Sequence, residues 1–173
     1  VLDRPLEKLG EVARAKRPRR IPVVFTHDEV LRIFAQMRGI PWVVANLLYG
    51  SGLRLMECLR LRIKDVDLER REIRVRDGKG RKDRVTMLPE RLIPHLRKHI
   101  ERARRYHQLD LTEGLGTVEL PYALARKYPN AAREFAWQYL FPSYKRSIDP
   151  RTRREGRQHV SADQIQRAVY AAI

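Results

Sequence analysis

The chain has 173 residues, enough for one domain with a sizeable core, and 43% of them are apolar, which excludes a disordered chain. The net charge of +16 predicts a polyanionic partner, first nucleic acid and second an acidic membrane surface. No apolar run approaches the roughly 20 residues that span a bilayer, so we expect no membrane partner. The single cysteine, Cys58, excludes an internal disulfide and a cysteine-based zinc site, and we expect it to be a small buried residue in a reducing compartment.

The first 21 residues are charged, contain prolines and include a basic run over residues 14–20. We predict a basic linker or arm that can lie along a phosphate backbone, and a solvated tail is the alternative. No signal-peptide pattern is visible. The chain starts at Val1 and stops within a predicted helix at Ile173, so we expect a fragment of a cytoplasmic protein.

Three helices are predicted between residues 27 and 61. The first begins at a capping box of Thr26 and Glu29 and ends at Gly39. The second begins at Pro41 and is apolar all round, which is typical of a core helix. A glycine-rich turn separates it from the third. The periodicity places these residues inward: Val30, Ile33, Phe34, Met37, Leu53, Met56 and Leu59.

Alternating apolar residues predict two strands at 71–76 and 84–88, joined by a turn that contains Gly78 and Gly80. We expect Ile73 and Val75 to face Val85 and Met87. A long basic helix is predicted over residues 90–107, and its buried stripe comprises Leu92, Leu96, Ile100 and Ala103.

The last third of the chain is less regular. We predict a short helix between Pro121 and Pro129, another over residues 130–137, and a short buried strand over residues 139–142. Residues 146–159 form an arginine-rich polar segment, and Ser161 begins a helix with Ile165, Val169 and Ala172 inward. The elements together predict an α+β fold, mainly α, with a small antiparallel sheet.

Arg54 and Lys79 are the first candidates for chemistry. Arg54 follows a Gly-Ser-Gly turn at a helix start, where backbone N–H groups favour an anion and a guanidinium matches phosphate oxygens. Lys79 lies between two glycines at the predicted hairpin tip, where it can contact a phosphate or donate a proton to a leaving oxygen. A surface arginine and an ordinary turn lysine are the alternatives. The spacing of a nucleotide-binding P-loop is absent.

The two motifs occur in one order: residues 50–61, then Lys64-Asp65-Val66-Asp67, then residues 78–84, then Leu88-Pro89. This order resembles the first half of a tyrosine recombinase catalytic domain over residues 22–100. The stretch 120–131, the aromatic residues Phe135 and Trp137, and the segment 141–143 resemble the insertion of the integron integrases. Asp149-Pro150-Arg151 and His159 match the family's segment after that insertion. The resemblance implies a linker at 1–21 and the N-terminal portion of a catalytic domain at 22–173, with an insertion, including a helix, at about 110–142.

The resemblance implies a phosphoryl transfer that needs no metal and no cofactor. Family members cut one DNA strand with a tyrosine, form a 3′-phosphotyrosine and rejoin the strand to a partner strand. Arg54 matches the arginine that binds the non-bridging oxygens, and Lys79 matches the lysine that protonates the leaving 5′ oxygen. Glu57 matches an acidic position that orients the site, and a structural ion pair is its alternative role.

The second half of such a site should supply a His-x-x-Arg pair and the nucleophilic tyrosine after the helix that starts at Ser161. None of the chain's tyrosines lies at that place, so we expect the chain alone to be inactive. His99 and Arg102 have the His-x-x-Arg spacing, but they precede the insertion, and we interpret them as a coincidence on a solvated basic helix face.

The insertion implies a further partner, because integron integrases act on folded single strands of cassette sites as well as on duplex sites. Trp137 and His159 are candidates to stack unpaired bases; a core tryptophan and a histidine at a strand end are the alternatives. We also expect the chain to associate with other protomers of the recombinase. The expected location is bacterial and nucleoid-associated. The remaining candidates for DNA binding are Lys82, Arg84, Arg151, Arg153, Arg154 and Arg157. A non-catalytic DNA-binding remnant and a basic RNA-binding protein are the rival functions.

Overall fold

The structure, a computed structural model, describes residues 24–76, 82–121, 124–149 and 153–173. Lys79 and Arg151 lie outside these residues. The described part is mainly helical with small antiparallel sheets, which confirms the predicted class. The helices are α1 His27–Gln36, α2 Gly39–Ser51, α3 Leu55–Leu59, α4 Ile93–Thr112, α5 Leu124–Lys127 and α6 Ala162–Tyr170. The strands are β1 Val66–Asp67, β2 Glu72–Val75, β3 Arg84–Met87, β4 Ser147–Ile148 and β5 Glu155–Gly156. Short 3-10 turns occupy Ile63–Asp65, Glu90–Leu92, Ala131–Arg133 and Phe135–Trp137.

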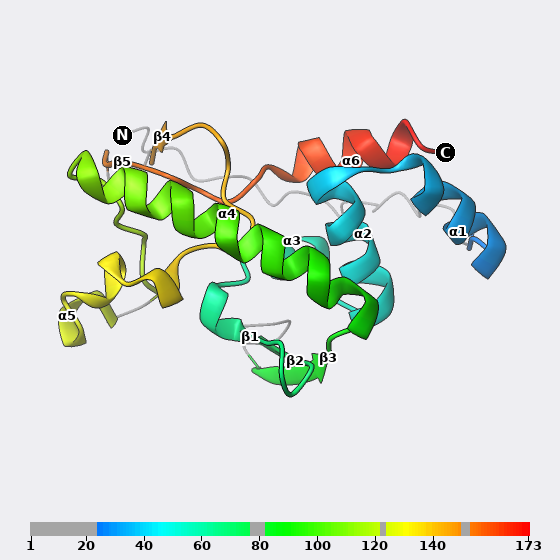
Figure 1. Ribbon diagram of the computed structural model, residues 1–173, viewed down its shortest axis with the longest axis horizontal. Helices are drawn as coiled ribbons and strands as arrows, with labels where there is room; N and C mark the ends of the chain where they lie inside the picture. The colour runs from blue at the N-terminus through cyan, green and yellow to red at the C-terminus, as the bar shows by residue number, and fades with distance from the viewer. Residues whose placement is uncertain (1–23, 77–81, 122–123, 150–152) are drawn as a thin grey trace, which may run out of the picture.

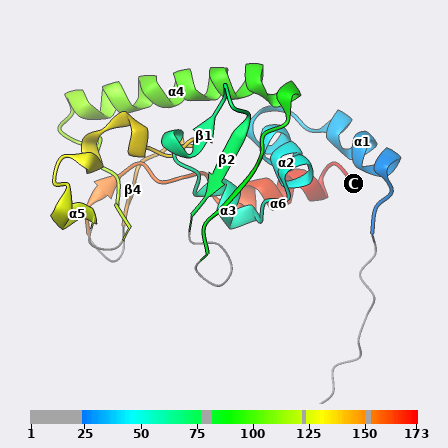
Figure 2. The same cartoon turned by 90° about the horizontal axis from the view of Figure 1, so that it is seen from below.

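The main core surrounds α2, the helix that is apolar all round. Val44 and Leu47 of α2 are fully buried, and so are Ile73 of β2 and Leu96 of α4. The long helix α4 spans the molecule between α1 at one end and α5 at the other (Figure 1). Figure 2 shows α4 along one side, with β2 and β3 running from it toward the opposite side. The core therefore joins α2, α4 and the sheet into one body.

Both predicted helix caps are present. Thr26 Oγ1 accepts a hydrogen bond from the backbone N–H of Glu29, and a Glu29 carboxylate oxygen accepts one from the N–H of Thr26. Ser161 Oγ accepts from the N–H of Gln164 at the start of α6. Ile165 is buried in the main core, while Val169 packs on a small cluster formed by α1 and α2. The inward faces predicted for α1 and α6 are therefore confirmed.

The three-stranded sheet has the order β1-β2-β3, and one prediction about it is wrong. The register pairs Ile73 with Thr86 and Val75 with Arg84, so Thr86 and Arg84 share the inner face with the two buried residues. Val85 and Met87 point outward and are 55% and 63% exposed. The period of two identifies both faces of a strand, but the register decides which face meets the core.

A second, smaller core forms between residues 118 and 139 from Val118, Leu120, Ala131 and Tyr139. The single helix predicted over residues 130–137 is wrong, because extended backbone at Glu134 divides it into two 3-10 turns. Residues 139–142 are buried as predicted. They pair with their neighbours only through isolated bridges, from Arg62 to Tyr139 and from Pro142 to His159.

Cys58 is fully buried in the main core, as predicted, and burial raises the pKa of its thiol well above the usual range. Among the described residues, no helix is long and apolar enough to cross a membrane.

Candidate functional site: an arginine-rich surface around α3

The turn before α3 positions Arg54. Gly52 adopts a left-handed conformation with φ of 62°, and Arg54 is the extended residue directly before α3. A side chain at Gly50 would place its Cβ 2.6 Å from Cγ of Pro89, so the turn packs tightly on the segment after β3. Thr86 Oγ1 donates to the carbonyl oxygen of Ser51 at 2.8 Å. The turn that carries Arg54 is therefore joined to β3.

Glu57 lies between two guanidinium groups. Its carboxylate accepts from Arg54 Nη1 at 2.8 Å and from Arg84 Nη1 and Nη2 at 3.1 and 2.8 Å. It also accepts from the backbone N–H of Arg54 at 2.9 Å, so this N–H is not free for an anion. The hydrogen bonds from Arg84, and then those from Arg54, outweigh the effect of burial and lower the pKa of Glu57 to about 2. The carboxylate is ionised at neutral pH and orients both arginines.

Arg54 keeps donors for a ligand. Its side chain is 57% exposed, and apart from Nη1 its guanidinium has no hydrogen-bond partner among the described residues. Helix α3 has only five residues, so the anion affinity expected from its N-terminus is weaker than that of a long helix. A fixed turn with an exposed, oriented guanidinium can still bind one phosphate through charge-assisted hydrogen bonds.

Arg84 was predicted to bind DNA, and the structure gives it a contact that the sequence did not reveal. Its guanidinium makes a two-pronged contact with Glu57 and also reaches the carbonyl oxygen of Gly52 at 3.4 Å. Lys82, two residues earlier, is exposed. Glu57 and Arg84 are 27 residues apart in sequence, so only the hairpin register could have indicated the pair.

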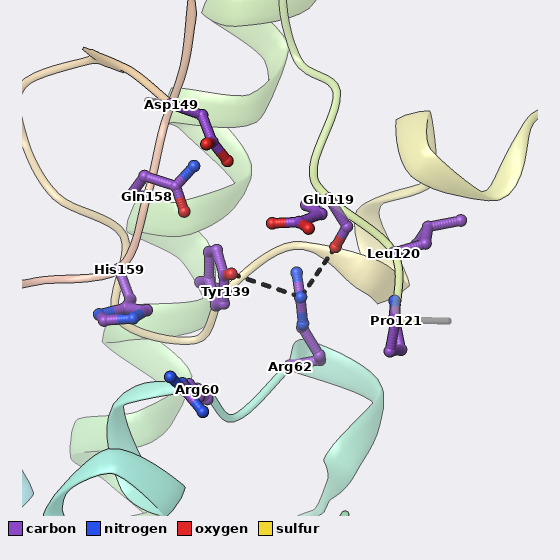
Figure 3. Close-up of a pocket in the computed structure, with 9 residues that line it drawn as sticks. All are labelled: Arg60, Arg62, Glu119, Leu120, Pro121, Tyr139, Asp149, Gln158 and His159. Atoms are coloured by element: carbon purple, nitrogen blue, oxygen red, sulfur yellow. Dashed lines mark hydrogen bonds between the residues drawn. The ribbon is translucent and has the colours of Figure 1, made fainter. Parts of the chain in front are cut away.

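A cavity of about 340 Å³ lies beside the end of α3, between residues 119–121 and the segment with Gln158 and His159 (Figure 3). Arg62 donates to the carbonyl oxygens of Trp137 and Glu119, both at 2.9 Å, and its guanidinium lies over the ring of Tyr139. His159 meets the Tyr139 ring edge-on, with 5.2 Å between ring centroids. Its Nδ1 donates to the carbonyl oxygen of Val160, which leaves Nε2 as an acceptor in the neutral ring.

Trp137 is half-buried and packs against the smaller core, so its ring has a packing role there. The ammonium group of Lys64 lies 2.8 Å from its ring centroid. Burial lowers the pKa of Lys64. One face of the ring is therefore in contact with a cation from the segment between α3 and the sheet.

Arg157, a candidate for DNA binding, is buried in an ion-pair network. Asp110 at the end of α4 accepts from Arg157 Nε and Nη2, both at 2.7 Å, and from Arg146 Nε at 2.8 Å. Arg157 Nη1 donates to the carbonyl oxygens of Ser143 and Tyr144, and its guanidinium lies over the ring of Tyr106. The geometry gives Arg157 a structural role. Arg153 and Arg154 are exposed.

His99 is not on a solvated face, which corrects the interpretation of the His-x-x-Arg spacing on α4. It is half-buried against the edge of Phe141, at 5.7 Å between ring centroids, and burial lowers its pKa to about 4. Arg102 lies 3.5 Å from its Nδ1. Within the described part of the chain, no group of three or more histidine, cysteine, aspartate or glutamate residues could hold a metal ion.

The model of the Phage integrase family matches residues 24–171, so the chain belongs to this family. The fold and the relatives agree that it is of the tyrosine recombinase type. Proteins named "Integrase/recombinase" from Escherichia coli and Pseudomonas aeruginosa are each 44% identical over the whole chain, which spans 51% of their length. "Tyrosine recombinase XerA" from Thermococcus kodakarensis is 42% identical over 89 residues, which are 50% of the chain and 32% of that protein. The crystal structure of XerA recombinase matches with a TM-score of 0.51 and 25% identity, over 91% of this chain and 43% of that one.

Proposed function

We propose that the chain is part of a site-specific DNA recombinase and that it carries the half of the active site that holds the phosphate. The observation that carries this proposal is the exposed Arg54 guanidinium, which Glu57 orients on a turn joined to β3 while Arg84 holds the same carboxylate. In the reaction, Arg54 donates to the non-bridging oxygens as negative charge builds on them. A tyrosine oxygen attacks the phosphorus, the bond to the 5′ oxygen breaks, and Lys79 supplies the proton to that oxygen. Membership of the Phage integrase family supports this chemistry.

The attacking tyrosine and the His-x-x-Arg pair then come from residues other than those of this chain. Tyr49 and Tyr170 are both exposed, but neither stands at the place that the family resemblance gives the nucleophile. The chain therefore binds the phosphate of duplex DNA without cutting it, and it assembles with other protomers before the strand is cut.

A suicide DNA substrate that carries the recombination site tests this division of the site. We expect noncovalent binding and no covalent adduct; an adduct through a tyrosine of this chain would overturn the division.

Arg54→Gln should lower the DNA affinity more than Arg97→Gln, which removes the same charge from an exposed residue of α4 that has no ion pair among the described residues. Equal affinities for the two variants would contradict the role of Arg54.

We further propose that this recombinase is an integron integrase, which also acts on folded single strands of cassette sites. Unpaired bases would then stack on Trp137 and His159. The support is local: the insertion has its own small core, Trp137 lies at the edge of that core, and His159 lines the adjacent cavity. Aromatic rings at such positions stack bases without reading their sequence.

Trp137→Ala tests the integron proposal against the core alternative. It should weaken binding of a folded cassette-site hairpin about 5- to 150-fold, the range for losing one stacking contact of about 1–3 kcal/mol, and weaken duplex binding much less. Tyr144→Ala is the matched control, because this tyrosine is 70% exposed and outside the insertion core. Equal losses on hairpin and duplex would refute base stacking, and tighter binding of competitor RNA would favour the RNA-binding rival.

A further inference from the structure

A second cavity lies between α3 and β2, with a volume of about 250 Å³. Four arginines line it: Arg60, Arg62, Arg74 and Arg76. The only carboxylates on the described walls of this cavity are those of Glu57 and Asp65. An anion can bind there only if some of the positive charge is not already neutralised.

Two of the four arginines have partners. Arg76 Nε donates to Asp65 Oδ1 at 2.7 Å, and Asp65 Oδ2 accepts from the backbone N–H of Arg62 at 3.0 Å. The Arg62 guanidinium donates to two backbone carbonyl oxygens. Glu57 is occupied by Arg54 and Arg84. Both carboxylates are therefore used by partners other than Arg60 and Arg74.

Arg60 and Arg74 are the unpaired cations of this cavity. Both are exposed, and neither guanidinium has a hydrogen bond or an ion pair with a described residue. Arg60 also lines the cavity of Figure 3, where it lies on the same side of Arg62 as His159, with Pro121 on the other side. Arg60 therefore stands where the two cavities meet.

The distance along α3 fits a nucleic-acid strand. Arg54 directly precedes and Arg60 directly follows the five-residue helix α3, whose rise is about 7.5 Å. One strand of a stacked duplex advances about 3.4 Å per phosphate, so this rise corresponds to two or three nucleotides. A strand whose phosphate binds at Arg54 would bring another phosphate close to Arg60.

We propose that Arg60 and Arg74 form a second phosphate-binding site, which holds a DNA phosphodiester two or three nucleotides from the one at Arg54. The inference rests on the proposed function, because the ligand is the backbone of the same DNA strand. The site guides the strand from Arg54 toward the cavity with Tyr139 and His159. It recognises the charge and not the base, so it contributes affinity without sequence preference.

The salt dependence of DNA binding tests this site. Binding of a duplex and of a single strand is measured from 50 to 200 mM salt for the unaltered chain, Arg60→Gln, Arg74→Gln and the double variant. Losing one phosphate contact should reduce the slope of log K against log salt by about 0.9 on the duplex and about 0.7 on the single strand. Because both arginines hold one phosphate, the double variant should lose little more slope than the stronger single variant.

Arg97→Gln is the charge-matched control, and its slope should stay close to that of the unaltered chain. Thermal melts of all variants should coincide, because the substituted side chains are exposed and unpaired. If the double variant keeps the slope of Arg97→Gln, the second phosphate site is wrong while the proposed function stands. If the unaltered chain binds no DNA, the proposed function fails and the site fails with it.

Discussion

Asp110→Asn separates a structural role of the buried arginines from a role in DNA binding. The side chains of Asp110 and Arg157 are 5% and 9% exposed, and that of Arg146 is 20% exposed. The substitution removes a negative charge and leaves two guanidinium groups beside a neutral amide. Breaking one partner of a buried ion pair costs about 3–5 kcal/mol. Arg146 keeps Glu113 and Arg157 keeps two carbonyl oxygens, so we expect the lower end, about 3 kcal/mol.

For a chain of this size, about 3 kcal/mol corresponds to a fall in melting temperature of about 6–12 °C. Circular dichroism during heating measures it, and Glu113→Gln is the control because it removes the solvent-exposed partner of the same Arg146, so its effect should be much smaller. Burial alone would raise the pKa of Asp110, but the hydrogen bonds from Arg157 and Arg146 outweigh it, so the pKa is lowered. The stabilisation is therefore present above the unfolded pKa and is lost as the pH falls through the folded value. If both variants melt within about 2 °C of each other and Asp110→Asn changes only DNA affinity, the structural role of Arg157 is wrong.

Three further predictions concern the turn and the hairpin. Gly50→Ala should lower the free energy of unfolding by about 1–3 kcal/mol in urea, because its methyl group meets Pro89; the same loss in a Pro89→Ala background would contradict this cause. Thr86→Val should cost about 1 kcal/mol by removing the hydrogen bond to the Ser51 carbonyl, and an unchanged urea midpoint would show that this bond is not needed. Arg84→Gln should raise the pKa of Glu57 from about 2 toward its ordinary 4.5. The difference in melting temperature from the unaltered chain should then be largest above about pH 4.5 and shrink as the pH falls toward 2, and a constant difference would refute it.

The local patterns of the sequence predicted much of the helical fold. The cap at Thr26 and the stripe from Leu92 to Ala103 depend on neighbours within one or two helical turns, so they can be read directly. The outward direction of Val85 and Met87 could not be read, because it depends on the register with β2. The two 3-10 turns between residues 131 and 137 also escaped prediction, because the backbone of residues 138–140 bonds to a distant segment at 61–63.

In the candidate site, too, local motifs could be read from the sequence and long-range contacts could not. The Gly-Ser-Gly-Leu-Arg motif singled out Arg54, and the structure places this side chain in an exposed position beside Glu57. The partners of Arg84 and Arg157 are 27 and 47 residues away in sequence, and no local pattern indicates them. A run of arginines predicts a charged surface. Only the fold shows which of the guanidinium groups are already paired with carboxylates. Arg60 illustrates the converse, since no motif distinguishes it from its neighbours.

The burial of Cys58 makes the chain suitable for site-specific labelling at an introduced cysteine. It is the only cysteine in the sequence, and its thiol is fully buried with a raised pKa. Alkylating reagents should therefore not react with it in the native state. A cysteine introduced at an exposed position, for example Lys82→Cys, would then react alone. A fluorophore or a DNA crosslinker attached there would report the path of the strand across α3 without any other change to the protein.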